Sequence, residues 1–145
     1  MTWLWQCSRG HRRAMLKFAL KLDGVASFAI GLLMAALRPE IGLPESFLIG
    51  VGAFAVLYGV FAFTLGTRER PDRRLVQLVV VCNVLWVADS VATLFLHPVT
   101  VLGEVLVIAQ ALGVVGFIVL QVMGLRATYG SARGTRPRSQ HPVAP

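Results

Sequence analysis

Four long apolar runs divide this chain, and the few polar residues inside them recur at helical spacing. The runs cover residues 15–37, 45–66, 75–97 and 100–125. A membrane crossing needs about 20 mostly apolar residues, each rising about 1.5 Å. Backbone within lipid must satisfy its own hydrogen bonds, which favours helices. Because the second run has almost no polar face, a soluble bundle of amphipathic helices fits poorly. The pattern predicts an all-α membrane protein with four transmembrane helices.

The links between the runs are short, and each contains a proline. They read "RPEIGLP", "TRERPDR" and "HPV". Short links make neighbouring helices antiparallel, so residues 15–126 are predicted to form an up-down four-helix bundle. The first 14 residues are interpreted as a basic N-terminal tail, with Met15 as an alternative start of translation. Residues 127–145 are rich in Pro, Gly, Ser and Arg and are predicted to be a disordered basic tail in the cytoplasm.

Basic residues are distributed very unevenly between the two ends of the predicted bundle. Thirteen of the 14 lie on one side, and only Arg38 lies on the other. The positive-inside rule then predicts that both termini lie in the cytoplasm. The excess of arginine over lysine, with abundant Ala, Val, Gly and Leu, indicates a GC-rich bacterial gene, so the expected location is a bacterial inner membrane. The thirteen are Arg9, Arg12, Arg13, Lys17, Lys21, Arg68, Arg70, Arg73, Arg74, Arg126, Arg133, Arg136 and Arg138.

The composition agrees with a membrane location and argues against nucleic-acid binding and against a metal or cofactor site. Hydrophobic residues make up 56% of the chain and charged residues 14%, against about 25% charged in a soluble domain. The net charge of +7 does not predict nucleic-acid binding, because the basic residues form blocks between apolar runs without interleaved aromatics. Cys7 and Cys82 belong to no CxxC or Cys/His cluster, so no metal site or cofactor is predicted. The expected partners are the lipid bilayer and either another membrane protein or a second copy of this chain.

Small residues form a stripe on each of the first two predicted helices. Close backbone contact drives helix association in lipid, so such stripes mark packing surfaces. We interpret both stripes as internal packing surfaces, with a dimer face as the alternative for one of them. The stripe of the first helix contains Asp23, Ser27, Gly31 and Ala35, and the stripe of the second contains Gly52, Ala55, Gly59, Ala62 and Gly66.

The third run carries polar residues that gather on one side of a helix. A charged group in mid-membrane costs about 2.5–3.5 kcal/mol, so this side is predicted to face the bundle, with Trp86 as a packing residue. Asp89 lies beside the stripe. The stripe itself contains Asn83, Trp86, Ser90, Thr93 and His97.

Counting residues from the helix ends sorts the intramembrane polar groups into two levels. Asp23, Asn83 and Gln110 are predicted at an inner level, where they hydrogen-bond across helices. Asp89 and Glu104 are predicted at an outer level. If these two carboxylates lie close together, they cannot both ionise cheaply, so the pair would serve a small transporter or proton-coupled carrier.

No catalytic residue is predicted. The intramembrane part of the sequence has one histidine, the adjacent Asp89 and Ser90 diverge by about 100° on a helix, and "GVGAFAVLYG" lacks the lysine of a phosphate-binding loop. We therefore expect a non-enzymatic accessory or structural membrane component rather than an enzyme. One alternative is a small transporter or proton-coupled carrier that uses Asp23, Asn83, Asp89 and Glu104. A lipid or quinone binder is another, and it requires a groove between helices flanked by Trp86 and Phe117.

Four segments together resemble a group of small bacterial four-helix integral membrane proteins. They are "KLDGVASFAIGLL", "GVGAFAVLYGVFAF", "VCNVLWVADSVATL" and "EVLVIAQALGVVGFIVLQVMGLR". The resemblance covers about residues 15–126. Its marks are Asp23, the Asn83-x-Leu85-Trp86 motif and Gln110, with Gln121 nearer the cytoplasm. It implies the fold and the membrane location. That group has no established activity, so the resemblance implies no reaction.

Overall fold

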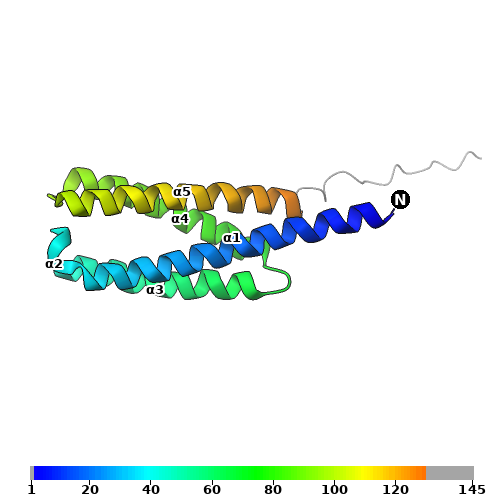
Figure 1. Ribbon diagram of the computed structural model, residues 1–145, viewed down its shortest axis with the longest axis horizontal. Coiled ribbons are helices and arrows are strands. Elements are labelled where there is room, and N and C mark those ends of the chain that lie inside the picture. Colours follow the sequence, from blue (N-terminus) through cyan, green and yellow to red (C-terminus); the bar gives the residue numbers. More distant parts are fainter. Residues whose placement is uncertain (1, 130–145) are drawn as a thin grey trace, which may run out of the picture.

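The bundle consists of four long helices and one short helix. The structure is a computed structural model that describes residues 2–129, with the side chains of residues 13–37 and 40–129. Figure 1 shows α1 lying beside α3, and α4 beside α5. α1 also packs against α5, whereas α3 and α4 make few contacts with each other. The predicted all-α four-helix bundle is confirmed. Its elements are α1 (Thr2–Ala36), α2 (Arg38–Ile41), α3 (Glu45–Thr67), α4 (Arg73–Leu96) and α5 (Val101–Tyr129).

Helix boundaries follow the sequence prediction at α3 and α4 and depart from it at both ends of the chain. α1 begins at Thr2, so the predicted boundary between a tail and a helix at residue 15 lies within one continuous helix. α5 continues to Tyr129, past the predicted end at residue 125. Residues 130–145, most of the predicted C-terminal tail, lie outside the described residues. The short helix α2 is an element that the pattern did not predict.

Capping residues in the links explain where α4 and α5 start. The Asp72 carboxylate accepts the backbone N–H of Arg74 at 2.7 Å and so caps the first turn of α4. The Thr100 hydroxyl oxygen accepts the backbone N–H of Gly103 at 3.1 Å at the start of α5. Pro71 and Pro98 lie between helices, as predicted, where their missing N–H breaks no helical hydrogen bond.

The link between α1 and α3 is attached to the start of α5. Thr100 donates its hydroxyl to the carbonyl of Glu40 at 2.6 Å and its backbone N–H to the carbonyl of Ile41 at 3.2 Å. Gly42 follows α2 with a φ of 82°, a left-handed conformation that a residue with a Cβ rarely adopts. This link and the α4–α5 link therefore lie at one end of the bundle, called here the opposite end. The arginine-rich α3–α4 link lies at the other, called the basic end.

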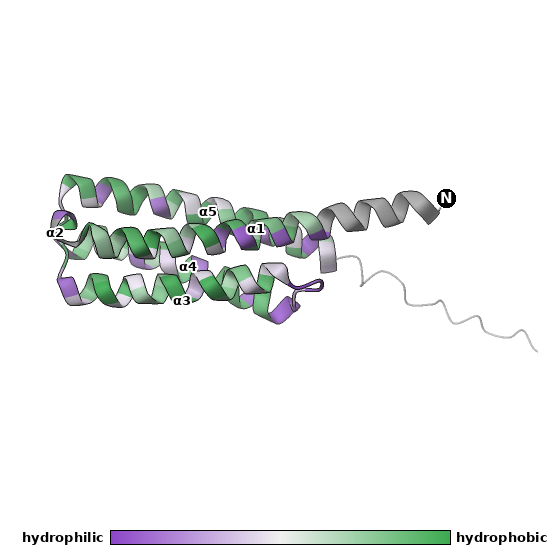
Figure 2. Cartoon of the chain, turned by 60° about the horizontal axis from the view of Figure 1, so that its bottom comes forward, coloured by the Kyte–Doolittle hydropathy of each residue, from purple (hydrophilic) through white to green (hydrophobic). Residues whose placement is uncertain are grey.

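The outer surface of the bundle is apolar, which is the reverse of a soluble helical protein. Phe95 is 83% exposed and Leu57 is 71% exposed, in the middle or last turns of helices. Figure 2 shows hydrophobic residues along the four long helices and hydrophilic ones in the α3–α4 link. Each of these helices has a segment of at least 23 residues that is long and apolar enough to cross a membrane. The chain is therefore a multi-pass membrane protein.

Glycines hold α1 and α3 in close contact. A Cβ added at Gly59 would lie 2.6 Å from the carbonyl oxygen of Gly24, and one added at Gly31 would lie 2.7 Å from that of Gly52. All five residues of the stripe predicted on the second helix are buried, and its glycines contact α1, which agrees with an internal packing surface. On α1 the contact includes Gly24 and Gly31, while Ala35 of the predicted stripe is exposed.

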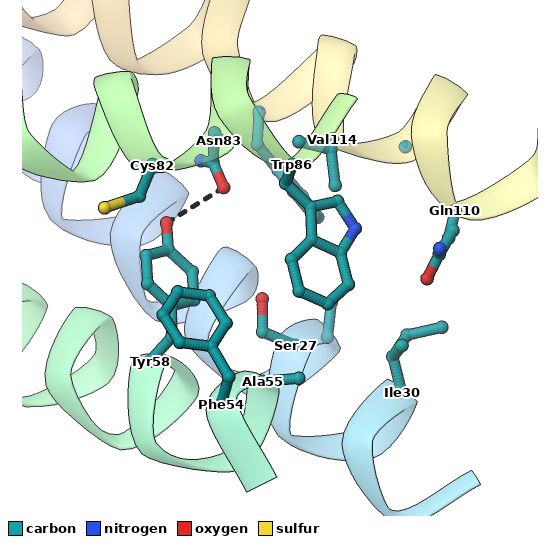
Figure 3. A pocket seen from close by; sticks show the side chains of 13 residues that line it. Ser27, Ile30, Phe54, Ala55, Tyr58, Cys82, Asn83, Trp86, Gln110 and Val114 are labelled. Atoms are coloured by element: carbon teal, nitrogen blue, oxygen red, sulfur yellow. Dashed lines mark hydrogen bonds between the residues drawn. The ribbon is translucent and has the colours of Figure 1, made fainter. Parts of the chain in front are cut away.

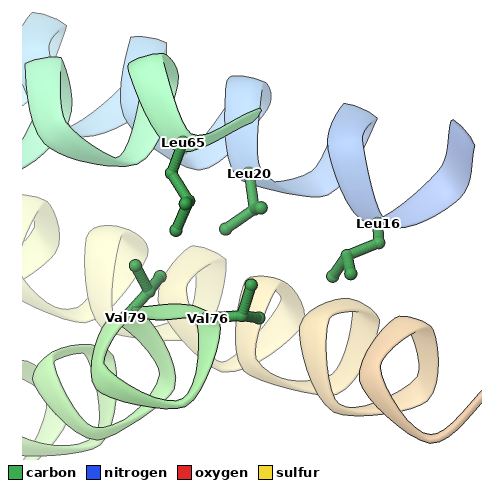
Figure 4. Packing of buried hydrophobic residues seen from close by; sticks show 5 residues of the cluster. All are labelled: Leu16, Leu20, Leu65, Val76 and Val79. Carbon is green, nitrogen blue, oxygen red and sulfur yellow. The ribbon is translucent and has the colours of Figure 1, made fainter. Parts of the chain in front are cut away.

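A small apolar core fills the bundle near its basic end. Leu16 and Leu20 of α1 pack there with side chains of α3 and α4, as Figure 4 shows. Tyr58, Leu75, Leu125 and Tyr129 pack against this cluster from its sides. The core closes the interior of the bundle at that end. It consists of Leu16, Leu20, Leu65, Val76 and Val79.

Candidate binding site

Directly above this core, the carboxylate of Asp23 is completely buried and accepts several hydrogen bonds at one oxygen. Its Oδ2 atom lies 2.9 Å from Nδ2 of Asn83, 2.7 Å from Nε2 of Gln121 and 2.9 Å from the hydroxyl of Tyr58. Ser27 Oγ approaches the other oxygen at 3.4 Å from the next turn of α1. Asp23 itself has 0% exposure. A buried carboxylate thus receives the donors that replace water.

The residues around Asp23 also bond to one another. The side-chain amide of Asn83 donates its second hydrogen to Oε1 of Gln121, at a distance of 3.2 Å. The Tyr58 hydroxyl lies 2.9 Å from Oδ1 of Asn83, so its single hydrogen is shared between two acceptors, Asn83 and Asp23. We call Asp23, Tyr58, Asn83 and Gln121 the polar network. Each member comes from a different long helix, so the network ties α1, α3, α4 and α5 together.

The prediction that Asp23 and Asn83 lie at one level and hydrogen-bond across helices is confirmed. The prediction that Gln110 joins them is wrong. Gln121 takes the place that the sequence prediction gave to Gln110. Gln121 lies eight residues before Tyr129, and Asn83 ten residues after Arg73. These offsets correspond to about 12 and 15 Å from the basic end, which is one level. Gln110 lies 11 residues before Gln121, about 16 Å further along α5, so it is about three turns away from this level.

Tyr58 is a functional residue that the sequence prediction missed. It is the one side chain of α3 that reaches the polar network, and its ring lies within an apolar helix. A tyrosine hydroxyl in such a position nearly always has a hydrogen-bond partner. The sequence did contain an indication of this role, because "AVLYGV" places a tyrosine next to a glycine of the packing stripe in an otherwise apolar run.

Next to the polar network is a cavity of about 160 Å³ bounded by all four long helices. Figure 3 shows Tyr58 and Asn83 at one end of it and Gln110 at the other. Trp86 and Phe117 both line it, which meets the condition set for a lipid or quinone binder. The remaining walls are mostly apolar and include Ile30, Phe54 and Val114.

Three stacked aromatic rings form one wall of the cavity. The rings of Trp86 and Phe54 have centroids 6.0 Å apart and planes inclined by 14°. The rings of Phe54 and Tyr58 follow at 6.2 Å and 19°. Trp86 was predicted as a packing residue, and it is half-buried with one side on the cavity. The stack offers a flat apolar surface that ends in the hydroxyl of Tyr58.

The cavity adjoins a groove between α3 and α4 that opens to the outside of the bundle. This groove has a volume of about 290 Å³ and shares Phe54, Cys82 and Trp86 with the cavity wall. Its rim includes Gly50 and Asp89. It exists because α3 and α4 make few contacts with each other. At the basic end, by contrast, the polar network and the apolar core close the interior.

The two carboxylates predicted at an outer level are not joined in the structure. Asp89 is exposed and lines the groove, whereas Glu104 is exposed in the first turn of α5 and is not among the residues that line the groove. No hydrogen bond or ion pair links either of them to another described residue. The prediction that all polar groups of the third run face the interior is thus wrong for Asp89. It holds for Asn83, Ser90 and Thr93, which are buried.

Gln110 lies between the central cavity and a smaller pocket next to Asp89. Its Oε1 atom is buried and has no hydrogen-bond partner among the described residues. The smaller pocket is lined by Gln110, Trp86, Asp89, Ser90 and Thr93, with apolar residues of α1, α3 and α5. The Ser90 hydroxyl is satisfied within α4, at 2.8 Å from the Trp86 carbonyl. Gln110 thus offers a hydrogen-bond acceptor to whatever occupies the cavity.

The cavity combines apolar walls with the amide side chains of Asn83 and Gln110, which can hold a ligand by packing and hydrogen bonding. The described side chains contain no group of three His, Cys, Asp or Glu residues that could hold a metal ion. Cys82 is a free thiol on the cavity wall. No protein-family model, curated protein or solved structure matches the chain.

Proposed function

We propose that this protein is a non-enzymatic component of a bacterial inner membrane that binds an amphipathic molecule dissolved in the bilayer, such as a lipid or a quinone. Both termini are proposed to lie in the cytoplasm, because thirteen of 14 basic residues belong to the basic end and its tails. The single observation that supports binding is the cavity flanked by Trp86 and Phe117, which shares lining residues with a groove between α3 and α4. Ligand sites in helical proteins are typically such cavities between helices.

The shape of the site favours entry from the bilayer. The polar network and the apolar core block the cavity toward the basic end. The groove between α3 and α4 lies on the lipid-facing side of the bundle, so a hydrophobic molecule reaches the cavity without crossing water. The coupled carrier is not proposed, since it depends on Asp89 and Glu104 in one site, and the groove and the smaller pocket that Asp89 lines do not include Glu104.

Two glycines of α5 provide a test with a matched control. Added Cβ atoms at Gly113 and at Gly116 meet nothing within 4 Å, so both tolerate a larger side chain. Gly113 lines the cavity, and Gly116 does not. We expect Gly113→Leu to lose the lipid or quinone that copurifies with the wild type in native mass spectrometry, and Gly116→Leu to retain it. Equal retention by both variants, or no bound molecule in the wild type, would contradict the proposal.

A further inference from the structure

Two hydrogen-bond acceptors without partners line the same pocket at the mouth of the site. They are the carboxylate of Asp89 and Oε1 of Gln110, and Trp86 lies between the pocket and the central cavity. A carboxylate in the hydrocarbon region is costly unless a counter-charge accompanies it. Asp89 forms no ion pair with a described residue, and the described basic side chains belong to the basic end. The chain itself thus supplies no partner for either acceptor in the part that the structure describes.

We infer that the molecule bound here is a lipophilic amine in its protonated, ammonium form. This inference rests on the proposed function and specifies its ligand. The ammonium group lies at Asp89, donates an N–H to Oε1 of Gln110 and faces the ring of Trp86. The apolar body extends into the cavity along the aromatic stack.

Each part of the site matches one property of such a ligand. The carboxylate of Asp89 compensates the positive charge, and the Trp86 ring is the aromatic surface that attracts cations most strongly. Gln110 requires a donor, which an ammonium has and a carbonyl lacks. The pocket that these residues share is small, about 20 Å³, so it fits an –NH₃⁺ head better than a trimethylammonium head. The adjoining cavity of about 160 Å³ accepts an alkyl chain or ring.

Three probes with the same alkyl chain separate these properties. Dodecylamine carries charge and N–H donors at neutral pH, dodecyltrimethylammonium carries charge alone, and dodecanol carries a donor without charge. The protein is reconstituted in nanodiscs of zwitterionic lipid. Binding is measured as the mole fraction of probe in the bilayer is increased. In a Trp3→Phe/Trp5→Phe background Trp86 is the only tryptophan, so its fluorescence reports the site directly.

We expect the wild type to bind dodecylamine at least about tenfold more tightly than dodecanol, a difference of about 1.4 kcal/mol. Asp89→Asn should abolish this preference, while Glu104→Gln, which removes an exposed acid outside the site, should keep it. Gln110→Leu should weaken dodecylamine binding and leave dodecyltrimethylammonium unchanged. Asp89 is exposed, so Asp89→Asn should fold normally, which circular dichroism verifies.

The outcomes separate this inference from the proposed function. The inference is overturned if Asp89→Asn keeps the preference for dodecylamine, or if the wild type binds dodecanol as tightly as dodecylamine. Either result would show that the site does not select its ligand by positive charge. The proposed function survives that result when Gly113→Leu still removes binding of both probes. If the wild type binds none of the three probes, the proposed function and the inference both fail.

Discussion

The side-chain amide of Gln121 donates a hydrogen bond of 2.7 Å to the carboxylate of Asp23, although 98 residues separate the two along the chain. Asn83 donates to the same oxygen from a third helix. Because all these groups are buried, each depends on the others for the hydrogen bonds that water would otherwise supply. The polar network therefore fixes the relative register of the helices beside the cavity.

Asp23→Ala should destabilise the protein by about 2 to 4 kcal/mol, because it leaves buried amide hydrogens of Asn83 and Gln121 without an acceptor. Equilibrium unfolding in bicelles measures this difference. The control is Ser90→Ala, whose hydroxyl bonds only within its own helix and whose loss should cost about 1 kcal/mol or less. Equal effects of the two substitutions would show that the network does not stabilise the fold.

A double-mutant cycle distinguishes the two glutamines of α5. Asp23→Ala combined with Gln121→Ala should give a coupling energy of about 0.5 to 1.7 kcal/mol, the range of interhelical hydrogen bonds in membranes. The same cycle with Gln110→Ala should be additive within about 0.5 kcal/mol, since no contact joins Gln110 to Asp23 in the described structure. Coupling to Gln110 in place of Gln121 would mean that α5 is rotated or shifted relative to the other helices.

Gly59→Ala should destabilise the bundle by about 1 to 3 kcal/mol, because its new Cβ would meet the Gly24 carbonyl at 2.6 Å and push α1 away from α3. Gly116→Ala is the matched control on a helix surface where nothing lies within 4 Å. It should be neutral or stabilise by up to about 1 kcal/mol through its helix propensity. Thermal unfolding of both variants in the same detergent provides the measurement, and a neutral Gly59→Ala would refute the close contact.

Reporter fusions test the proposed orientation. Alkaline phosphatase is active only outside the cytoplasm, so a fusion after Glu69 in the α3–α4 link should be inactive. A fusion after Pro98 in the α4–α5 link should be active. The reverse pattern would place the basic end outside the cell and contradict the positive-inside argument.

Much of the fold was predictable from sequence, because a long apolar segment can cross a bilayer in only a few backbone conformations. Four helices, their antiparallel order and the glycine stripe of α3 all follow from run length, link length and residue size. The start of α1 at Thr2 was not predictable in this way, because residues 2–14 are too polar for the hydropathy pattern that defined the other helices.

The site was predictable only in part, because helix register decides which polar groups meet. Asp23 and Asn83 stood out as polar residues in apolar runs, and they do bond. Gln121 and Tyr58 were not predicted as members of the network, since the rotation of each helix about its own axis depends on tertiary packing. Asp89 and Glu104 looked alike in sequence, yet α4 turns Asp89 to the groove while Glu104 stays in an exposed first turn.

The most direct test of ligand access from the bilayer is a nuclear Overhauser experiment on the protein in nanodiscs with protonated acyl chains. The side-chain amide of Gln110 and the indole of Trp86 should show cross-peaks to acyl-chain protons if lipid enters the cavity by way of the adjoining groove, as proposed. The amide of Gln121, which is completely buried in the polar network, should show none. Cross-peaks from the Gln110 amide to water alone, with none to acyl chains, would contradict a lipid-facing binding site.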